Sequence, residues 1–259
     1  MADITAYKPY YSVLILAFFC SLLVGSAAVG LRPLQEKNKQ QDRKKNILMA
    51  AGLYDSTRTV ADLFGNIETR IVDLENGTFV SVDTVSPEGF DQLKAALSDE
   101  LGRPLTKAED IAGIRGIERY SRVYLVTDDD TVRRVILPIR GKGLWSTLYG
   151  YIAIEDDMST VSGISFYEHG ETPGLGGEIE NLRWQSGWQG KKIYNQSNEE
   201  ALVVGQKKGQ EEAINHVDGL SGATLTIQGV DDIITFWFGK HGFKPFLTRL
   251  RENGGRIDG

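Results

Sequence analysis

The strongest pattern at the start of the chain is an uncharged, mostly apolar run of 20 residues, Ser12 to Leu31. A helix needs about 20 such residues to cross about 30 Å of hydrocarbon, so the run predicts one transmembrane helix. Aromatic residues favour the membrane interface, and Tyr7, Tyr10 and Tyr11 stand on its N-terminal side. Arg32-Pro33 supplies a polar stop at the other end.

A cleaved signal peptide is the alternative for this run, because Ser26-Ala27-Ala28 is small enough for a peptidase site. Lys8 gives only a weak basic region before the run, and apolar residues continue beyond the cut, which favours a retained helix. The sequence therefore divides into an N-terminal tail (1–11), a transmembrane helix (12–31), a charged helical connector (32–66) and a larger domain (67–259).

Hydrophobic periodicity beyond the run changes from helical to alternating. The pattern from Leu34 to Phe64 predicts a charged amphipathic helix broken near Gly52, with apolar positions at Ile47, Leu48, Ala51, Ala61 and Leu63. The next elements are expected in this order: strands Arg70–Val72 and Thr78–Val85 around a turn at Asn76-Gly77, helices Pro87–Leu101 and Ala108–Ile114, strands Ser121–Thr127, Thr131–Pro138, Tyr149–Ile154 and Val161–Glu168, strand Ala201–Gly205, helix Glu211–Val217 and helix Ile227–Phe238.

Strand pairs with interspersed helices predict an α+β domain built on a twisted antiparallel sheet with flanking helices. Trp184 and Trp188, at helical spacing, are expected to be core or docking aromatics. The turn Asp128-Asp-Asp130 is expected to be solvated, and Asp156-Asp157 is expected to separate two neighbouring strands. The three histidines form no recognisable metal pattern.

Composition limits the function. A hydrophobic content of 41% in 259 residues suffices for one well-packed domain plus an anchor. A formal net charge of −6 argues against nucleic acid as a partner, since phosphate-backbone binding relies on a basic surface. Cys20 is the one cysteine, so the chain alone forms neither a disulfide nor a cysteine-based metal centre, and redox chemistry would need an organic cofactor.

The stretch Asp218-Gly-Leu-Ser-Gly-Ala-Thr-Leu-Thr226 carries the clearest candidate chemistry. Its small residues let the backbone approach a ligand, its hydroxyls donate hydrogen bonds, and the N-terminus of the following helix favours an anion. An ordinary helix start with a Ser/Thr cap is the alternative interpretation. The stretch contains neither a P-loop nor a dinucleotide-binding fingerprint.

Ser221 to Thr226, Ser-Gly-Ala-Thr-x-Thr, resembles the flavinylation motif of FMN-binding subunits of respiratory flavoprotein complexes. Two further stretches, Gly141-Lys-Gly-Leu-Trp145 and His169-Gly-Glu-Thr-Pro-Gly-Leu-Gly-Gly-Glu178, resemble the C subunits of sodium-translocating NADH:ubiquinone reductases. The G subunits of Rnf electron-transport complexes share the flavinylation motif but are usually shorter. An insert of roughly Thr69 to Arg119 favours the sodium-pump family.

The resemblance implies that Thr226 carries FMN through a phosphoester bond and that residues 67–259 are an FMN-binding domain. Further cofactor-binding residues are expected in three groups: Ser221, Gly222, Ala223 and Thr224 to shape the phosphate loop, Trp145 and Leu175 to pack on the flavin ring, and Glu171 and Thr172 to meet its polar edge or ribityl chain. Gly176 is expected to be a further cofactor-binding residue. Lys207 and Lys208 would neutralise phosphate, or else form a solvated basic pair.

The resemblance further implies an electron relay in a membrane complex that couples NADH oxidation and ubiquinone reduction to sodium export. Another subunit would oxidise NADH, and a separate flavin transferase would attach FMN. A membrane-anchored ligand-binding or sensor domain is the non-redox alternative. Family members place the flavin domain in the periplasm, across the bacterial inner membrane, whereas the basic residues that follow the apolar run, Arg32 to Lys45, favour the cytoplasm.

Overall fold

The computed structural model describes residues 8–206 and 213–257, which fall into two compact units, Met1–Arg43 and Lys44–Gly259. Helix α1 (Lys8–Ala50) begins in the first unit and contains Pro33 in its interior. Pro33 therefore does not end the helix, because a long helix tolerates the loss of one main-chain hydrogen bond. Among the described residues, α1 is the one helix long and apolar enough to cross a membrane. Tyr7 lies outside the described residues.

The end of α1 has a specific backbone cause. Gly52 adopts a positive φ of 66°, which glycine tolerates without steric cost. Its N–H donates to the Met49 carbonyl at 3.0 Å, and the Leu53 N–H donates to the Leu48 carbonyl at 2.8 Å. This pair of bonds is a Schellman motif and confirms the predicted break near Gly52.

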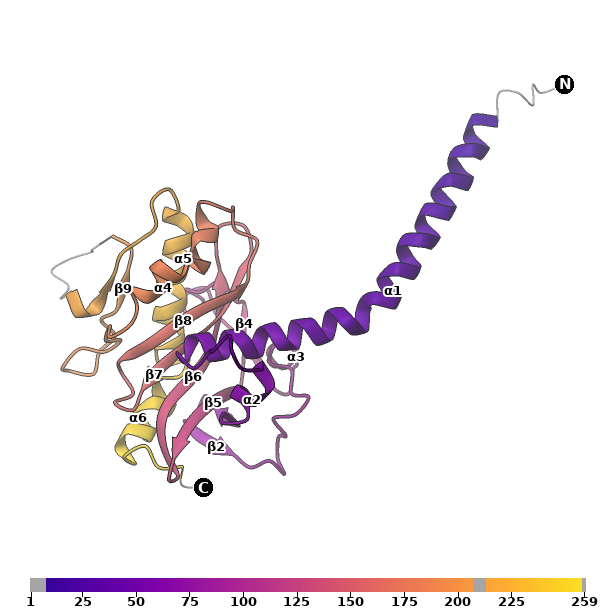
Figure 1. Cartoon of the computed structure of the whole chain (residues 1–259). Helices are drawn as coiled ribbons and strands as arrows, with labels where there is room; N and C mark the ends of the chain where they lie inside the picture. Colours follow the sequence, from indigo (N-terminus) through magenta and orange to yellow (C-terminus); the bar gives the residue numbers. More distant parts are fainter. Residues whose placement is uncertain (1–7, 207–212, 258–259) are drawn as a thin grey trace. The chain divides into compact units, whose positions relative to one another are not determined.

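The second unit is built on a six-stranded antiparallel sheet in the order β2-β1-β5-β6-β7-β8 (Figure 1). Its strands are β1 (Glu68–Asp73), β2 (Thr78–Val80), β5 (Tyr120–Asp128), β6 (Thr131–Lys142), β7 (Thr147–Glu155) and β8 (Val161–Glu168). Two small pairs join β3 (Gly102–Pro104) to β4 (Gly116–Glu118) and β9 (Val203–Val204) to β10 (His216–Val217). The helices are α2 (Val60–Phe64), α3 (Gln92–Ala96), α4 (Leu182–Ser186), α5 (Thr224–Trp237) and α6 (Lys244–Glu252), with 3-10 turns η2 (Gly176–Glu180) and η3 (Ala213–Asn215). The predicted α+β class is confirmed.

Alternating side chains of the central strands enter two separate cores. On β6, Val135 and Leu137 join the cluster that contains the buried face of α5, whereas Ile136 joins the cluster formed with the last turns of α1 and with α2. Side chains alternate between the faces of a strand, so each core lies on its own face of the sheet. Ile47 and Leu48 are buried in the second cluster, as their spacing predicted.

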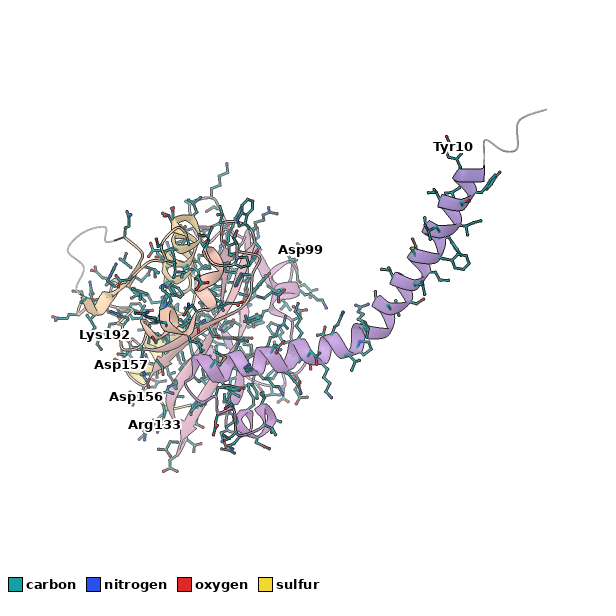
Figure 2. The ribbon with its side chains drawn as sticks, turned by 45° about the horizontal axis from the view of Figure 1, so that its top comes forward. Tyr10, Asp99, Arg133, Asp156, Asp157 and Lys192 are labelled. Carbon is teal, nitrogen blue, oxygen red and sulfur yellow. The ribbon has the colours of Figure 1, made fainter. Side chains whose placement is uncertain are left out.

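Two predicted turns are present. In the turn between β1 and β2, Gly77 has a φ of 67°. In the turn between β7 and β8, the Asp157 carboxylate accepts the N–H groups of Ser159 and Thr160, at 3.0 and 2.7 Å, and pairs with Lys192 Nζ at 3.0 Å (Figure 2). Burial opposes ionisation, but these hydrogen bonds outweigh it and lower the pKa of Asp157 to about 2.

Several predicted helices are wrong or shorter. The helix predicted over Pro87–Leu101 is reduced to α3. Asp91 sets its start by accepting the N–H groups of Leu93 and Lys94, and Leu97 is its C-cap residue. Residues 108–114 form turns in which the Asp110 carboxylate accepts the Ile114 N–H at 2.7 Å. In the described part of 211–217, η3 leads into β10, which pairs with β9. Ala61, expected on an apolar face, is exposed, whereas Leu63 is buried.

Helix α5 is held against β6 by glycines on both elements. A Cβ on Gly229 of α5 would press against the Lys142 carbonyl oxygen and lie 3.2 Å from Gly143 Cα. A Cβ on Gly141 of β6 would press against the Ile233 side chain. Close packing at these points fixes the start of α5 beside the loop that follows β6.

We therefore expect Gly229→Ala to destabilise the chain by about 1–3 kcal/mol through overpacking. The sign is informative, because alanine is better than glycine in a helix interior by about 1 kcal/mol when packing does not intervene. Gln228→Ala, at an exposed position of the same helix, is the matched control. Chemical unfolding of both variants checks this, and a Gly229→Ala variant as stable as the wild type would contradict the packing argument.

Candidate functional site

The three sequence motifs meet at the N-terminal end of α5. Thr226 lies in the first turn of the helix, which begins at Thr224 and not at the predicted Ile227. The Thr226 residue is 1% exposed, and its Oγ donates a hydrogen bond to Glu171 Oε2 at 2.6 Å. Two residues separated by 55 positions in the sequence are thus in direct contact.

Glu171 also joins the loop between β6 and β7. Its carboxylate accepts the backbone N–H groups of Leu144, Trp145 and Ser146 at 3.3, 2.9 and 3.3 Å. The side chain is buried, with the residue 5% exposed. A buried carboxylate needs such donors, because desolvation of an unpaired charge is costly.

These donors decide the charge of Glu171. Burial alone would raise the pKa of the carboxyl group, but the hydrogen bonds from Thr226, Trp145, Ser146 and Leu144 outweigh burial and hold the pKa below its usual value. Glu171 is therefore a carboxylate at neutral pH.

The backbone around Glu171 is held by two residues that sequence reasoning did not select. The Glu171 N–H donates to His169 Nδ1 at 3.1 Å, and the Gly170 N–H donates to Ser146 Oγ at 2.6 Å. His169 and Ser146 adjoin or lie within the recognised motifs. No spacing rule, however, marks a side chain that accepts a hydrogen bond from a loop backbone.

Two predicted glycines have defined steric roles. A Cβ on Gly176 would lie 2.5 Å from Thr226 Oγ and 3.0 Å from Glu171 Oε2, so a larger residue there would collide with the Thr226–Glu171 contact. Gly222 has a φ of 75°, and a Cβ there would lie 3.0 Å from the Leu175 side chain. Glycine thus permits both the turn and the close approach.

The start of α5 is suited to an anion. Ala223 is the N-cap residue and makes no side-chain capping bond. The first N–H groups of a helix have no partner within the helix, and they favour phosphate. Ser221 and Thr224 are exposed beside this helix end, whereas Ala223 is buried.

The segments that meet at Thr226 carry exposed apolar residues, called here the apolar rim. We use this name for Leu144, Trp145, Leu175 and Leu225, which are 43%, 69%, 46% and 58% exposed. Leu144 and Leu225 were not selected from the sequence, although both lie inside the recognised motifs. Large apolar side chains gathered at a surface are typical of a binding site.

Thr172 lies at the turn between Glu171 and Gly177. Its side chain is exposed, and its carbonyl accepts the N–H groups of Leu175 and Gly177 at 3.1 and 2.9 Å. In this structure Thr172 therefore shapes the turn that carries Leu175.

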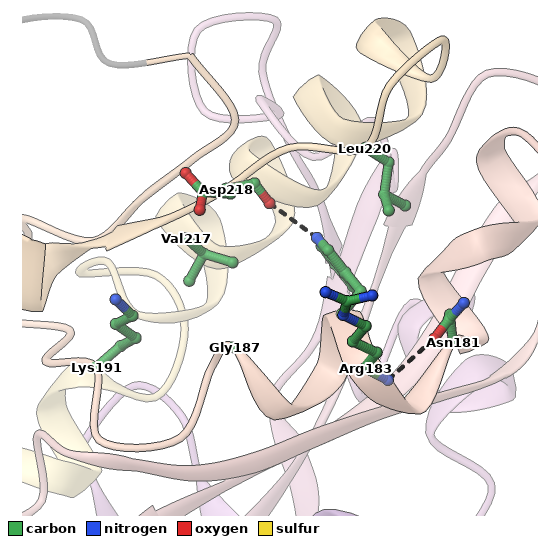
Figure 3. A pocket seen from close by; sticks show the side chains of 8 residues that line it. Asn181, Arg183, Gly187, Lys191, Val217, Asp218 and Leu220 are labelled. Atoms are coloured by element: carbon green, nitrogen blue, oxygen red, sulfur yellow. Dashed lines mark hydrogen bonds between the residues drawn. The ribbon is translucent and has the colours of Figure 1, made fainter.

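A separate hollow of about 410 Å³ lies beside the start of the stretch from Asp218 to Thr226 (Figure 3). Its lining includes Asn181, Arg183, Trp184, Lys191, Asp218 and Leu220. The Trp184 indole N–H donates to the Asp218 carbonyl at 2.8 Å, which ties α4 to the loop. Trp188 is fully buried and meets Trp184 edge to face, with ring centroids 5.5 Å apart. The two tryptophans are thus core aromatics, one of the two roles that their spacing predicted.

The structure brings Trp145, Glu171, Leu175, Gly176 and Thr226 into one region, joined by direct contacts of Glu171, Gly176 and Gly222. None of the predicted cofactor-binding side chains lines the hollow of Figure 3. Lys207 and Lys208 lie outside the described residues.

Comparison with known proteins gives consistent relatives. Residues 143–238 match the family model described as FMN-binding domain. The chain is 46% identical over 246 residues to the C subunit of the Na(+)-translocating NADH-quinone reductase of Pseudomonas aeruginosa, covering 92% of this chain and 94% of the relative. It is 46% identical to the C subunit of the same reductase from Vibrio alginolyticus, covering 92% of each. The crystal structure of Shewanella oneidensis NqrC superposes with a TM-score of 0.73 at 35% identity, covering 83% of this chain and 99% of that one.

The lowered pKa of Glu171 has a consequence for stability. Its contribution is fully present above the unfolded pKa, near 4.5, and is lost as the pH falls through the lower folded-state pKa. We expect Glu171→Gln to cost about 2 kcal/mol at pH 7, the scale of hydrogen bonds to a charged group. The gap to wild type should stay constant down to about pH 5 and shrink in more acidic solution. Urea unfolding across this pH range checks the trend, and a gap that widens on acidification would contradict it.

Proposed function

The chain belongs to the family of C subunits of Na(+)-translocating NADH-quinone reductases, and we propose that it serves such a complex as the subunit that carries FMN and relays electrons. FMN supplies a redox centre that accepts and passes on electrons. The chain is not the NADH-oxidising subunit, and its partners are the other subunits of the complex.

Covalent attachment of FMN to Thr226 through a phosphoester is the central part of the proposal. The observation that carries it is the position of the Thr226 hydroxyl in the uncapped first turn of α5, directly beside the predicted motif residues. A phosphate bonded to this oxygen would lie near free helix N–H groups, which favour an anion. The fit of the residues to the cofactor rests on this geometry.

The remaining contacts follow from the surroundings of Thr226. We assign Ser221, Gly222, Ala223 and Thr224 to the phosphate, because they form the turn into α5. Trp145 and Leu175, with Leu144 and Leu225 of the same apolar rim, would cover the flavin ring. Glu171 and Gly176 belong to the site through their direct contact with Thr226, and Thr172 through the turn that it shapes.

The membrane span, the orientation of the domain and the maturation enzyme complete the proposal. We propose a membrane span over 12–31, a connector over 32–66 and an FMN-binding domain over 67–259, in a bacterial inner membrane with the domain in the periplasm. Long domains translocate largely regardless of the charge of their flanks, which reconciles this orientation with the basic connector. A separate flavin transferase would attach FMN.

The first test is chemical. In protein purified from its native host, we expect a denaturation-stable mass increase of one FMN and in-gel flavin fluorescence, both lost in Thr226→Ala because the acceptor oxygen is removed. Thr235→Ala, which removes an exposed hydroxyl of the same helix outside the motif, is the matched control and should keep the adduct. An unmodified native protein that binds phosphate compounds reversibly would favour the sensor function instead. Co-purification with ferredoxin-linked subunits would favour an Rnf-type relay.

The orientation has its own test. A Cys20→Ser chain with one new cysteine at the exposed Ser186 carries a single thiol on the FMN-binding domain. We expect a membrane-impermeant maleimide to label this thiol in cells whose outer membrane has been permeabilised. Labelling that appears only after the inner membrane is broken would place the domain in the cytoplasm.

A further inference from the structure

The Thr226 hydroxyl is shut inside the folded chain. The residue is 1% exposed, its Oγ is 2.6 Å from Glu171 Oε2, and the Cα of Gly176 faces the same oxygen so closely that a Cβ there would lie 2.5 Å away. A phosphorus atom with its oxygens must come within about 3–3.5 Å of a nucleophile in a reactive geometry. The groups around Thr226 Oγ occupy the space that such an approach requires.

The contacts that close the site form a connected clamp, by which we mean the bonds of Glu171 to Thr226 and to residues 144–146, together with the Gly170–Ser146 bond. The clamp joins two loops to the start of α5. A carboxylate that accepts several hydrogen bonds is held more strongly than a neutral group, because charge-assisted hydrogen bonds are stronger than neutral ones.

The clamp can form only while Thr226 is unmodified, because it needs the Thr226 hydroxyl as a hydrogen-bond donor. After a phosphoester forms, Thr226 Oγ carries no hydrogen to donate to Glu171. The added phosphodiester is an anion next to a carboxylate, and like charges at this distance repel. The Thr226–Glu171 bond and the modification are therefore mutually exclusive.

The segment that can open is the one that carries Glu171. Residues 172–175 are exposed, and Gly174 has a φ of 76° with nothing within 4 Å of a Cβ built on it. Glycines at 170, 174, 176 and 177 give this segment wide backbone freedom. Helix α5, in contrast, is fixed on β6 through Gly229. Opening thus moves the segment from His169 to Gly176 away from Thr226.

We propose that the clamp is a gate on cofactor attachment: the folded chain accepts FMN at Thr226 only in states in which Glu171 has released the hydroxyl. This inference rests on the proposed attachment site. In the step itself the Thr226 O–H bond breaks, a bond forms from Oγ to the phosphorus of a flavin phosphoanhydride, and the bond from phosphorus to the leaving phosphate breaks. The proton passes to solvent or to the transferase.

The gate has a direct kinetic test. Full-length unmodified protein is mixed with excess flavin transferase and flavin adenine dinucleotide, and adduct formation at Thr226 is followed by intact mass and peptide mapping. Weakening the clamp raises the open population, so we expect Glu171→Ala to be modified at least about tenfold faster than wild type. Ser146→Ala, which removes the acceptor of the Gly170 N–H but keeps Glu171, should be faster by a smaller factor.

Glu178→Gln is the matched control, because Glu178 lies on the same segment and accepts a bond from the Asn181 side chain. It should be modified at the wild-type rate. Wild-type protein in urea below its unfolding transition should also be modified faster, which keeps the test decisive if Glu171→Ala fails to fold. Variants modified no faster than wild type, or more slowly, would overturn the gate. A wild-type chain that gains no adduct at Thr226, even in urea, would instead overturn the proposed attachment site and the gate with it.

Discussion

Burial of the Glu171 carboxylate is the constraint on which the arrangement of the site depends. A charged group inside a protein must be paired with donors, and here the donors come from two segments, residues 144–146 and Thr226, that are both far from Glu171 in the sequence. Satisfying one carboxylate therefore fixes the β6–β7 loop, the segment after β8 and the first turn of α5 relative to one another. The same need sets the protonation state of Glu171, since its donors outweigh its burial.

The scaffold supplies the precision that this carboxylate requires. The sheet is buried on both faces, so its central strands have little freedom to shift. The Trp237 indole N–H donates to the Arg140 carbonyl at 2.7 Å, and Arg140 pairs with the buried Glu118 at 2.6 Å. Glu118 lies in the segment from Thr69 to Arg119, which sequence analysis interpreted as an insert. That segment is thus anchored through Arg140 of β6, which also accepts the hydrogen bond from α5. Loss of either partner of the buried ion pair would strongly reduce stability, because the other charge would stay buried and unpaired.

Sequence patterns correctly predicted the α+β class, the helix break at Gly52 and the turn at Asn76-Gly77, because each of these features depends on local periodicity or on glycine conformation. They failed at Pro87–Leu101, where Asp91 caps a helix that begins only at Gln92, and at Ala108–Ile114, where the Asp110 side chain bonds the backbone of a turn. At the site, motif resemblance selected Thr226 and Glu171, but no local rule placed them in contact. His169, Ser146 and Leu225 were missed because their roles arise only when separate loops meet.

The apolar rim also bears on how the protein behaves before its cofactor is attached. Its four large apolar side chains are exposed to solvent on the unmodified chain, in the segments that meet at Thr226. Exposed apolar side chains promote association between molecules. Unmodified molecules would therefore associate through the apolar rim, which a bound flavin ring would cover. Cells that synthesise the polypeptide faster than they mature it would accumulate the more aggregation-prone form, and colourless recombinant preparations should be less soluble than yellow ones.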